Sequence, residues 1–495
     1  MRNKALNLLL MAVLLSSCQL NPVEQTAEVY CVDSIVMPEG LTAEVSALDF
    51  LADGRLVAGF MRGEILLYDP STDAWEVFAT GLHEPLGIRV ISPAEMLVMQ
   101  LPELTLLKDT DGDGKADVYQ TVFDDFGMTG NYHEFAYGPV KDQDGNTYIA
   151  LNAASSGGGI SQETRGDTLM IGKSETSRAM FSVVPYRGWV LQIDSSGQMT
   201  PFASGLRSPN GMVVDQENRL FVTENQGDWV GSSALYHIQK DKFYGHPSSL
   251  VWTEGWDRGN PFDLTTAQLD AMREAPAVIF PHDILANSPS QPVMIHEHPA
   301  LAVFDGQMLV GEMGSERLVR VQLESVNGVM QGAATTFIDG SGLRKGNNRL
   351  VFAPNGDLWV GQADHGWLGD RGIQRISFTG RVPFDIQHIS LQKDGFDIEL
   401  TKPLSYHDSL WTDSTLHVQR YRYAYHEKYG SPQIDLEDLE VKVSDVSSDR
   451  RRLKLVLDDL KSGFVYQVTL NGLISTDGQD TLDHKAVFYT VKELR

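Results

Sequence analysis

The sequence predicts an all-β protein, a six-bladed β-propeller followed by an immunoglobulin-like β-sandwich. Three observations predict this class: glycine is frequent, at 45 of 495 residues, the apolar stretches are short, and one hairpin pattern recurs through the first three quarters of the chain. In each copy an apolar strand meets a turn of Asp, Asn or Gly, and a second apolar strand follows, as a β-hairpin requires. The copies lie at 41–60, 81–100, 133–152, 205–225, 298–313 and 346–364.

Most copies are followed by another short strand, so each repeat is expected to form a unit of four strands. Such a unit cannot bury its faces alone, whereas six units can bury them by stacking radially around a channel. We therefore assign residues 40–383 to the propeller, and an extended pair of β-sandwiches is the alternative. Insertions at 153–185 and 245–297, the second with a helical pattern at 265–275, interrupt the repeat. Long insertions on one face often build a binding site.

The pattern changes near Phe384. From there to the C-terminus, segments alternate strictly between apolar and polar residues, which is typical of strands with one buried face. We assign residues 384–495 to a separate sandwich that is immunoglobulin-like in its number of strands. It lacks the paired cysteines of antibody domains and shows no catalytic pattern. We expect it to pack on the propeller or on a partner.

The first 18 residues are typical of a lipoprotein signal peptide. Two basic residues precede an apolar stretch at 5–17, and the segment LSSC at 15–18 reads as a lipobox. The stretch is too short for a permanent membrane span, so processing is expected to leave Cys18 lipidated. Residues 19–39 then form a linker. The body is expected outside the cytoplasm, anchored to a bacterial membrane as a periplasmic, outer-membrane or cell-surface protein. A plain signal peptide with a chance cysteine is the alternative.

The chain is strongly acidic, with 40 basic and 66 acidic residues and a net charge of −26. This charge argues against nucleic acid and against an anionic membrane surface as partners, so membrane contact is expected through the lipid only. After lipidation of Cys18, Cys31 is left alone, which excludes an intramolecular disulfide. The sequence has no C-x-x-C-H motif for covalent haem. Any oxidation would therefore need an external electron acceptor.

The segment DTDGDGKAD at 109–117 is the sharpest local motif. Oxygen ligands at alternate positions with a glycine at the sixth can wrap a hard cation that prefers six to eight oxygens. Gln120 stands where a complete EF-hand has Glu, so the loop is not a full EF-hand. A solvated acidic turn is the alternative. The expected calcium ligands are Asp109, Asp111, Asp113 and Asp117, and the ion is expected to staple the loop rather than to act on substrate.

Other polar residues gather near the expected inner ends of the strands, in hairpins and in the loops beside them. Because the inner strands of a propeller converge at the mouth of its channel, these residues are expected to meet in one concave polar site. For any one histidine, a hydrogen-bonded loop position is the alternative. The residues expected in this site are His133, Arg207, Asn210, Glu224, Asp228, His246 and His282.

The calcium-like loop, GLRSPNGM at 205–212, FYGHP at 243–247 and the sandwich after the propeller together resemble the glucose/sorbosone dehydrogenase superfamily. The resemblance covers about residues 40–380. It is greatest to the "membrane-bound dehydrogenase" propellers of environmental bacteria, some of which carry a haem c domain. It implies a six-bladed propeller that oxidises a sugar with pyrroloquinoline quinone and Ca²⁺.

The resemblance also implies residue roles. His133 would be the base that takes a hydroxyl proton as hydride leaves the sugar carbon. Arg207 would contact the quinone, and Glu224 and Asp228 would lie near Ca²⁺. The pattern departs from the family at Ser208, which replaces an asparagine, and at Gly314, Gly346 and Asn348, which replace cations. The implied cofactor-binding residues are Arg207, Asn210, Glu224, Asp228 and Arg349.

Three functions are open on the sequence. The first is a sugar, polyol or aldose dehydrogenase with His133 as base and Arg207 as orienting residue. The second is a metal-dependent, non-redox carbohydrate lyase or dehydratase, with Glu134 or a free histidine as base. In that case His246, His282 and His365 would hold a divalent transition metal, and His282 would also be catalytic. The third is a glycan-binding lipoprotein that holds an oligosaccharide for other enzymes.

Overall fold

The computed structural model describes residues 29–162, 164–172, 179–364, 369–407 and 409–495. The expected lipidation site Cys18 and the expected metal ligand His365 lie outside these ranges. Within them the chain is nearly all-β, which confirms the predicted class at that level. No helix in the described ranges is long and apolar enough to cross a membrane.

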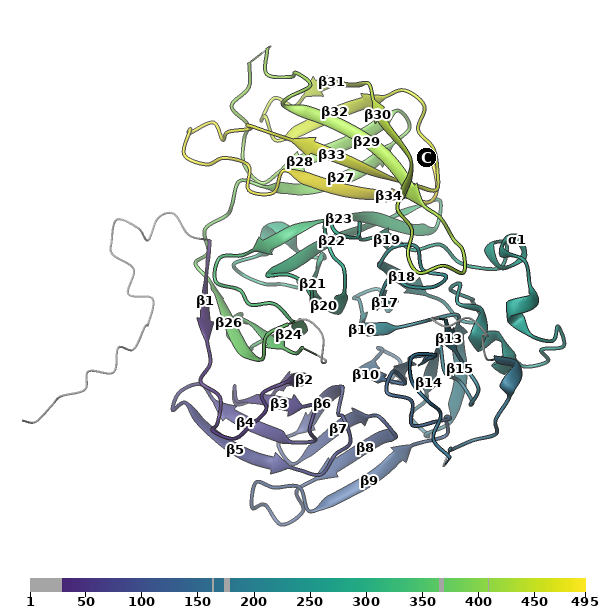
Figure 1. Ribbon diagram of the computed structural model, residues 1–495. Coiled ribbons are helices and arrows are strands. Elements are labelled where there is room, and N and C mark those ends of the chain that lie inside the picture. The colour runs from purple at the N-terminus through teal and green to yellow at the C-terminus, as the bar shows by residue number, and fades with distance from the viewer. Residues whose placement is uncertain (1–28, 163, 173–178, 365–368, 408) are drawn as a thin grey trace, which may run out of the picture.

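Groups of four antiparallel strands surround a common centre (Figure 1). In chain order their strands are β2 (Val45–Phe50), β3 (Leu56–Phe60), β4 (Ile65–Asp69) and β5 (Ala74–Ala79); β6 (Gly87–Ser92), β7 (Glu95–Gln100), β8 (Glu103–Lys108) and β9 (Val118–Phe123); β10 (Ala136–Lys141), β11 (Thr147–Leu151), β14 (Trp189–Ile193) and β15 (Met199–Ser204); β16 (Pro209–Val214), β17 (Leu220–Glu224), β18 (Ala234–Ile238) and β19 (Val278–Ile279); β20 (Pro289–Met294), β21 (Met308–Glu312), β22 (Arg317–Val326) and β23 (Val329–Asp339); and β24 (Asn347–Phe352), β25 (Leu358–Gln362) and β26 (Gly372–Phe378) with β1 (Tyr30–Ser34).

The first strands β2, β6, β10, β16, β20 and β24 contact one another in turn, and β24 contacts β2, so they form a closed ring. Neighbouring sheets are held together by apolar side chains. Ala47, Val57 and Ile65 of one sheet, for example, share a buried cluster with Met96 and Val98 of the next. Burial between sheets is the stabilisation that a single four-stranded unit lacks.

The ring is closed by residues from its two ends. β1 pairs antiparallel with β26, with Cys31 opposite Ser377. The sequence prediction that residues 19–39 are a linker is therefore wrong for 30–34, which form the outer strand of the last sheet. The sequence concealed this strand because its partner lies at the far end of the propeller segment rather than across a local hairpin.

The C-terminal part of the chain forms two facing sheets (Figure 1). Their strands are β27 (Ile386–Gln392), β28 (Gly395–Leu400), β29 (Leu416–Tyr423), β30 (Gln433–Leu439), β31 (Val441–Val446), β32 (Arg452–Leu457), β33 (Phe464–Leu470) and β34 (Ala486–Val491). One sheet has the order β27-β28-β32-β31, and the other has β34-β33-β29-β30. Ile398 and Leu455 from the first and Tyr466 and Val487 from the second share one buried core.

The two parts of the molecule share a sheet. β34 pairs antiparallel with β23, with Ala334 opposite Phe488, so the fifth group of strands continues into the C-terminal sheet. A second buried cluster joins Phe221 and Val310 of the ring to Tyr421 of β29. The C-terminal sheets therefore pack on the ring.

The insertions contain short elements: β12 (Ala154–Ser155), β13 (Met180–Phe181), η1 (Met170–Gly172), η2 (Pro247–Trp252), η3 (Pro261–Asp263), α1 (Thr266–Asp270) and, before β21, η4 (Ala302–Phe304). α1 begins at a capping box formed by Thr265 and Gln268 and ends at Asp270, short of the predicted 265–275. Both insertions turn back toward the ring and supply residues to the site described below.

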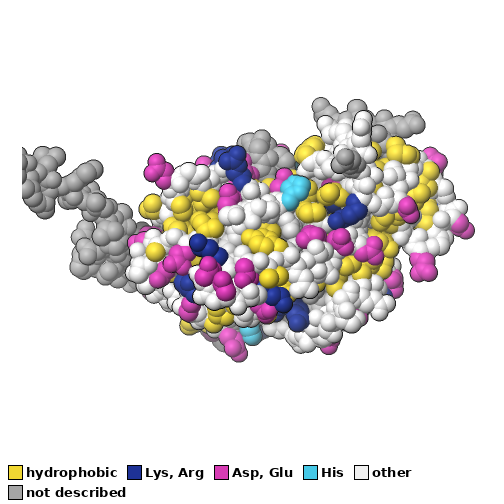
Figure 2. Space-filling model, turned by 90° about the horizontal axis from the view of Figure 1, so that it is seen from below, with side chains coloured by type: hydrophobic (Ala, Val, Ile, Leu, Met, Phe, Trp, Pro, Cys, Tyr) yellow, Lys and Arg dark blue, Asp and Glu magenta, His cyan; other side chains and the backbone are white. Residues whose placement is uncertain are grey.

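The surface reflects the acidic composition. On the face that carries β5 and β9, Asp and Glu side chains are spread among apolar and uncharged ones, with fewer Lys and Arg between them (Figure 2). A surface of this kind favours neutral or cationic ligands over polyanions.

Candidate functional site

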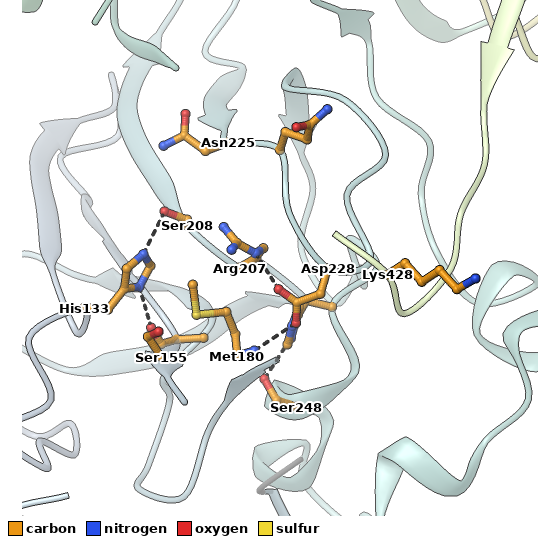
Figure 3. A network of polar contacts seen from close by, with 12 residues as sticks. His133, Ser155, Met180, Arg207, Ser208, Asn225, Asp228, Ser248 and Lys428 are labelled. Atoms are coloured by element: carbon orange, nitrogen blue, oxygen red, sulfur yellow. Dashed lines mark hydrogen bonds and ion pairs between the residues drawn. The ribbon is translucent and has the colours of Figure 1, made fainter. Parts of the chain in front are cut away.

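His133 is buried immediately before β10, with 7% of its surface exposed. Its Nδ1 lies 2.9 Å from the carbonyl oxygen of Ala153, so Nδ1 carries the hydrogen and Nε2 presents a lone pair. Nε2 lies 3.4 Å from Oγ of Ser208 (Figure 3). Burial and the nearby positive charge of Arg207 lower the pKa of His133 to about 4, so the ring is neutral at pH 7. A neutral imidazole held in one tautomer can accept a proton at Nε2.

Arg207 forms a buried ion pair with Asp228, in which Nε donates to Oδ1 over 2.7 Å. The other carboxylate oxygen accepts from the backbone N–H of Met180 at 2.8 Å and lies 3.0 Å from Nε2 of His246. Burial alone would raise the pKa of Asp228, but His246 and Arg207 outweigh it and hold the pKa below its ordinary value. His246 is fixed in turn by Ser248, whose Oγ lies 2.9 Å from Nδ1. Both insertions thus meet at Asp228 and hold Arg207 in place.

The terminal nitrogens of Arg207 remain available. The guanidinium lies flat on Gly227, where a Cβ atom would come within 2.0 Å of Cζ. The ring of Tyr429 lies 5.3 Å from Cζ. Nη1 and Nη2 make no hydrogen bond with any described residue, and in Figure 3 they point away from Asp228, toward the side on which Asn225 lies. They are donors in position for a ligand.

Buried acceptor atoms without a partner surround Ser208. Within the described part of the chain, Oδ1 of Asn152 and Oδ1 of Asn225 are buried and accept no hydrogen bond. Nδ2 of Asn152 donates to Oγ of Ser208 at 3.4 Å, and the N–H of Asn225 donates to its carbonyl at 3.3 Å. An unsatisfied buried polar group costs about 1–3 kcal/mol, so such atoms mark a place for a bound hydroxyl or water. We call His133, Asn152, Arg207, Ser208 and Asn225 the His133 cluster.

The Glu224 carboxylate binds backbone groups of the cluster rather than facing a ligand. Its carboxylate accepts from the backbone N–H groups of Arg207 at 2.9 Å, Ser208 at 2.6 Å and Asn225 at 3.1 Å. Burial raises its pKa to about 7 despite these donors. Glu312 does the same one sheet further on, where it accepts from the N–H of Ser288 at 3.0 Å. In five of the six groups a polar residue stands at the end of the second strand: Gln100, Asn152, Glu224, Glu312 and Gln362.

Glu134 does not have the geometry of a base. Its carboxylate accepts from the N–H of Thr129 at 2.7 Å and from the hydroxyl of Thr129 at 2.9 Å. Its backbone carbonyl accepts from Nη1 of the buried Arg187 at 2.7 Å. The Glu134 carboxylate therefore ties down the loop that presents the neighbouring His133.

Arg349 fills the centre of the ring. It donates to the carbonyls of Ser46 at 2.8 Å and Leu86 at 3.1 Å, and to Oδ1 of Asn210 at 3.2 Å. Its Cζ lies 5.0 Å from the ring of Tyr137. Burial lowers the pKa of Arg349 to about 10. The cavity beside it holds only 40 Å³. Arg349 and Asn210 therefore bind strands of the ring to one another.

The expected transition-metal ligands are not brought together in the described residues. Both ring nitrogens of His246 are engaged, by Ser248 and Asp228. His282 is partly exposed, with Nε2 3.7 Å from Asp283, and no described hydrogen bond or ion pair joins it to His246 or His133.

The acidic loop between β8 and β9 gathers three of its four expected ligands. Carboxylate oxygens of Asp109, Asp111 and Asp113 lie within 4.8 Å of one another. Asp117 is turned away and accepts from the hydroxyl of Thr110 at 2.6 Å. The loop is exposed and leads into the outer strand β9, so a cation bound there would stabilise the turn between β8 and β9.

Pyrroloquinoline quinone fits the described residues poorly. A tricarboxylate needs several cationic donors, because charge-assisted pairs carry much of such binding. In the cluster the described residues supply one cation, Arg207, which Asp228 already neutralises. The orphaned atoms of Asn152 and Asn225 are acceptors, which repel carboxylates and match hydroxyl donors. The donor set therefore suits a neutral polyhydroxylated ligand better than the quinone.

Sequence reasoning missed Ser208, Asn152 and Asn225 as site residues. The repeat itself carried a signal for Asn152, because the polar end of the second strand recurs at the same place in five copies. It also missed the aromatic rings at the two ends of the cluster. Tyr132 lies edge-on to His133 with ring centroids 6.0 Å apart, and Tyr429 comes from the sandwich, where no chemistry was expected.

Comparison with known sequences gives one family match. Residues 68–280 match a family model described as a domain of unknown function, DUF7133. The matched segment is less than half of the chain. No curated protein matches the sequence.

Several solved structures are similar to the chain. An oxidoreductase from Thermus thermophilus described as a glucose dehydrogenase is 18% identical, with a TM-score of 0.49, and the match covers 70% of this chain and 100% of that one. The quinone-bound aldose sugar dehydrogenase of Streptomyces coelicolor is 17% identical, with a TM-score of 0.46, covering 70% and 98%. The soluble aldose sugar dehydrogenase of Escherichia coli is 14% identical, with a TM-score of 0.48, covering 70% and 99%.

Proposed function

We propose that the chain is a sugar-dehydrogenase-like enzyme that acts on a neutral sugar or polyol at the His133 cluster. This proposal rests on one observation: the free donors of Arg207 lie beside acceptor atoms of Asn152 and Asn225 that have no partner. A hydroxyl group both donates and accepts hydrogen bonds, so neighbouring hydroxyls of one sugar satisfy both kinds of atom at once. Neither a polyanion nor an apolar ligand does so.

In this proposal His133 is the base. Its Nε2 takes the proton of a sugar hydroxyl, and the Ala153 carbonyl stabilises the imidazolium through Nδ1–H. The terminal nitrogens of Arg207 orient the reacting oxygen and stabilise the negative charge that develops on it. The hydride leaves the same carbon for a two-electron acceptor that enters as a second substrate. No step depends on a tightly held tricarboxylate quinone.

Dye reduction tests this proposal. We expect the full chain to reduce an artificial electron acceptor with at least one neutral aldose or polyol of a panel, and His133→Ala to lose at least a hundredfold of kcat/KM. His417→Gln is the matched control, because His417 is an exposed histidine paired with Asp438 on the sandwich. Equal loss in both variants, or full activity in His133→Ala, contradicts the role given to His133.

Glycan binding without turnover is a second candidate, favoured by the two exposed tyrosines at the ends of the cluster. Tyr132 and Tyr429 keep 57% and 61% of their surface exposed. Binding that survives His133→Ala, together with no dye reduction in the wild-type chain, identifies this function.

We propose in addition that Ca²⁺ binds the loop at Asp109, Asp111 and Asp113 and stabilises the turn between β8 and β9. Three clustered carboxylates and a glycine-rich backbone are the donors that a hard cation takes. Isothermal titration with Ca²⁺ should show one site that Asp111→Asn weakens. Heat of binding that is unchanged in this variant contradicts the assignment.

We propose that the ring is a six-bladed propeller, that β27–β34 form an immunoglobulin-like sandwich, and that Cys18 anchors the protein outside the cytoplasm through lipid. Metabolic labelling with a fatty-acid analogue tests the anchor, since Cys18→Ser should abolish the label. Label that persists in this variant contradicts it.

A further inference from the structure

A loop of the sandwich, residues 424–431 between β29 and β30, lies against the propeller beside the His133 cluster. Three backbone hydrogen bonds fasten it: Trp229 N–H to His426 O at 2.9 Å, Gly430 N–H to Gly227 O at 2.9 Å, and Ser431 N–H to Gly231 O at 2.9 Å. In addition, Asp228 and Tyr429 form an antiparallel β-bridge.

Glycines permit this close approach. A Cβ atom at Gly231 would lie 2.5 Å from the carbonyl oxygen of Ala424. Gly430 has a φ of +61°, and a Cβ there would meet Gln226 at 2.7 Å. The propeller segment 226–231 that receives the loop is the same segment that carries Asp228 and so positions Arg207. The site and the sandwich are therefore built on one piece of backbone.

The loop presents Tyr429 at the site. The Arg207 guanidinium occupies a position 5.3 Å from its ring, yet 61% of Tyr429 remains exposed. At the other end of the cluster, Tyr132 is 57% exposed and lies edge-on to His133. An exposed tyrosine gains little for folding, whereas its rigid ring offers contact area to a ligand at low entropic cost. One ring thus contacts His133 and the other contacts Arg207, so both border the His133 cluster.

We propose that Tyr429 is a specificity-determining residue of the site, contributed by the sandwich, and that its ring stacks on the face of a neutral sugar whose hydroxyls bind the His133 cluster. This inference rests on the proposed function and deepens it. The sandwich thereby has a role in recognition, and substrates are selected jointly by the two parts of the chain.

The test compares Tyr429→Ala and Tyr429→Phe with Tyr119→Ala in the full chain, using D-glucose, D-galactose, D-xylose and D-glucuronate as probes. Tyr119 is a control because it is an exposed tyrosine, at 45%, on the outer strand β9. We expect Tyr429→Ala to raise Kd or KM for the preferred neutral sugar about tenfold with little change in kcat, and Tyr429→Phe to restore it. The melting temperature should not change.

A second variant, Gly430→Ala, tests whether the position of the whole loop matters as well as the Tyr429 ring. Gly430→Ala strains the backbone at a φ of +61° and crowds the Gln226 side chain, so it should displace the loop and raise KM in the same way. Unchanged KM in both Tyr429→Ala and Gly430→Ala, with turnover still lost in His133→Ala, overturns this inference and leaves the proposed function intact. A wild-type chain that neither binds nor oxidises any probe overturns both.

Discussion

Arg207 uses one nitrogen, Nε, for its 2.7 Å bond to Asp228 and keeps both terminal nitrogens free of described partners. The ion pair with Asp228 thus holds the guanidinium in place and leaves its two terminal nitrogens able to bind a ligand. Asp228 is in turn fixed by residues of both long insertions. This relationship explains how buried charge can be part of a binding site and not only of a core.

The ion pair should be essential to the fold around the site. Asp228→Asn removes the charge that balances Arg207, and breaking a buried pair typically costs about 3–5 kcal/mol. Urea denaturation of the full chain measures this loss. Asp339→Asn is the control, because the pair of Asp339 with Arg317 is exposed and should cost about 1 kcal/mol or less. Similar costs in the two variants would contradict the role assigned to the buried pair.

The pH dependence of turnover should show a base of low pKa. Because the pKa of His133 is about 4, its Nε2 stays unprotonated well below pH 6.5, and kcat/KM should fall only as the pH drops toward 4. The same shift affects stability. The unfolded chain binds a proton on this histidine below about pH 6.5 and the folded chain only below about 4, so its contribution is present above pH 6.5 and is lost as the pH falls. An acid limb centred near 6.5 would contradict the buried position of His133.

Glu224 and Glu312 occupy equivalent positions at the ends of second strands, but their replacement should affect sugar binding differently. Glu224→Gln leaves one oxygen for three backbone donors and displaces the loop that carries Arg207 and Ser208, so we expect weaker sugar binding and a loss of about 1–3 kcal/mol in stability. Glu312→Gln should cost similar stability and leave the Kd for sugar unchanged. Calorimetry with titration of a neutral sugar separates the two. Equal Kd values for both variants would contradict a link between Glu224 and the cluster.

Arg349 should behave as a core residue. Arg349→Met leaves buried carbonyls of the inner strands without a donor, so the full chain should lose about 3–5 kcal/mol in stability. KM for sugar in the surviving folded protein should be close to wild type. Arg371→Met, which alters an exposed arginine paired with Asp364, is the control. A variant that keeps its stability and loses a bound cofactor would support the role first expected of Arg349.

The sequence predicted much of the ring because each hairpin is local. Turn residues and alternation mark the strands of the repeat, and these short-range signals do not depend on distant partners. β1 and the pairing of β34 with β23 were missed because both join residues that are far apart in the chain. Such pairings leave no periodic mark on either segment.

The site was predicted in part. His133, Arg207 and Asp228 do come together, whereas Glu134, Arg349 and Asn210 are engaged in holding loops and strands. The sequence alone does not show whether a buried polar residue binds a ligand or satisfies a backbone group. Its hydrogen-bond partners in the structure distinguish the two cases. The role of Tyr429 was hidden because its position depends on how the sandwich docks.

The most direct test of the central claim is isothermal titration of the full chain with a panel of neutral aldoses and with pyrroloquinoline quinone, repeated for Ser208→Leu, which fills the His133 cluster. We predict that at least one aldose binds the wild-type chain, that Ser208→Leu abolishes this binding, and that the quinone shows no stoichiometric site. Stoichiometric quinone binding, or aldose binding that is unchanged in Ser208→Leu, would contradict the account.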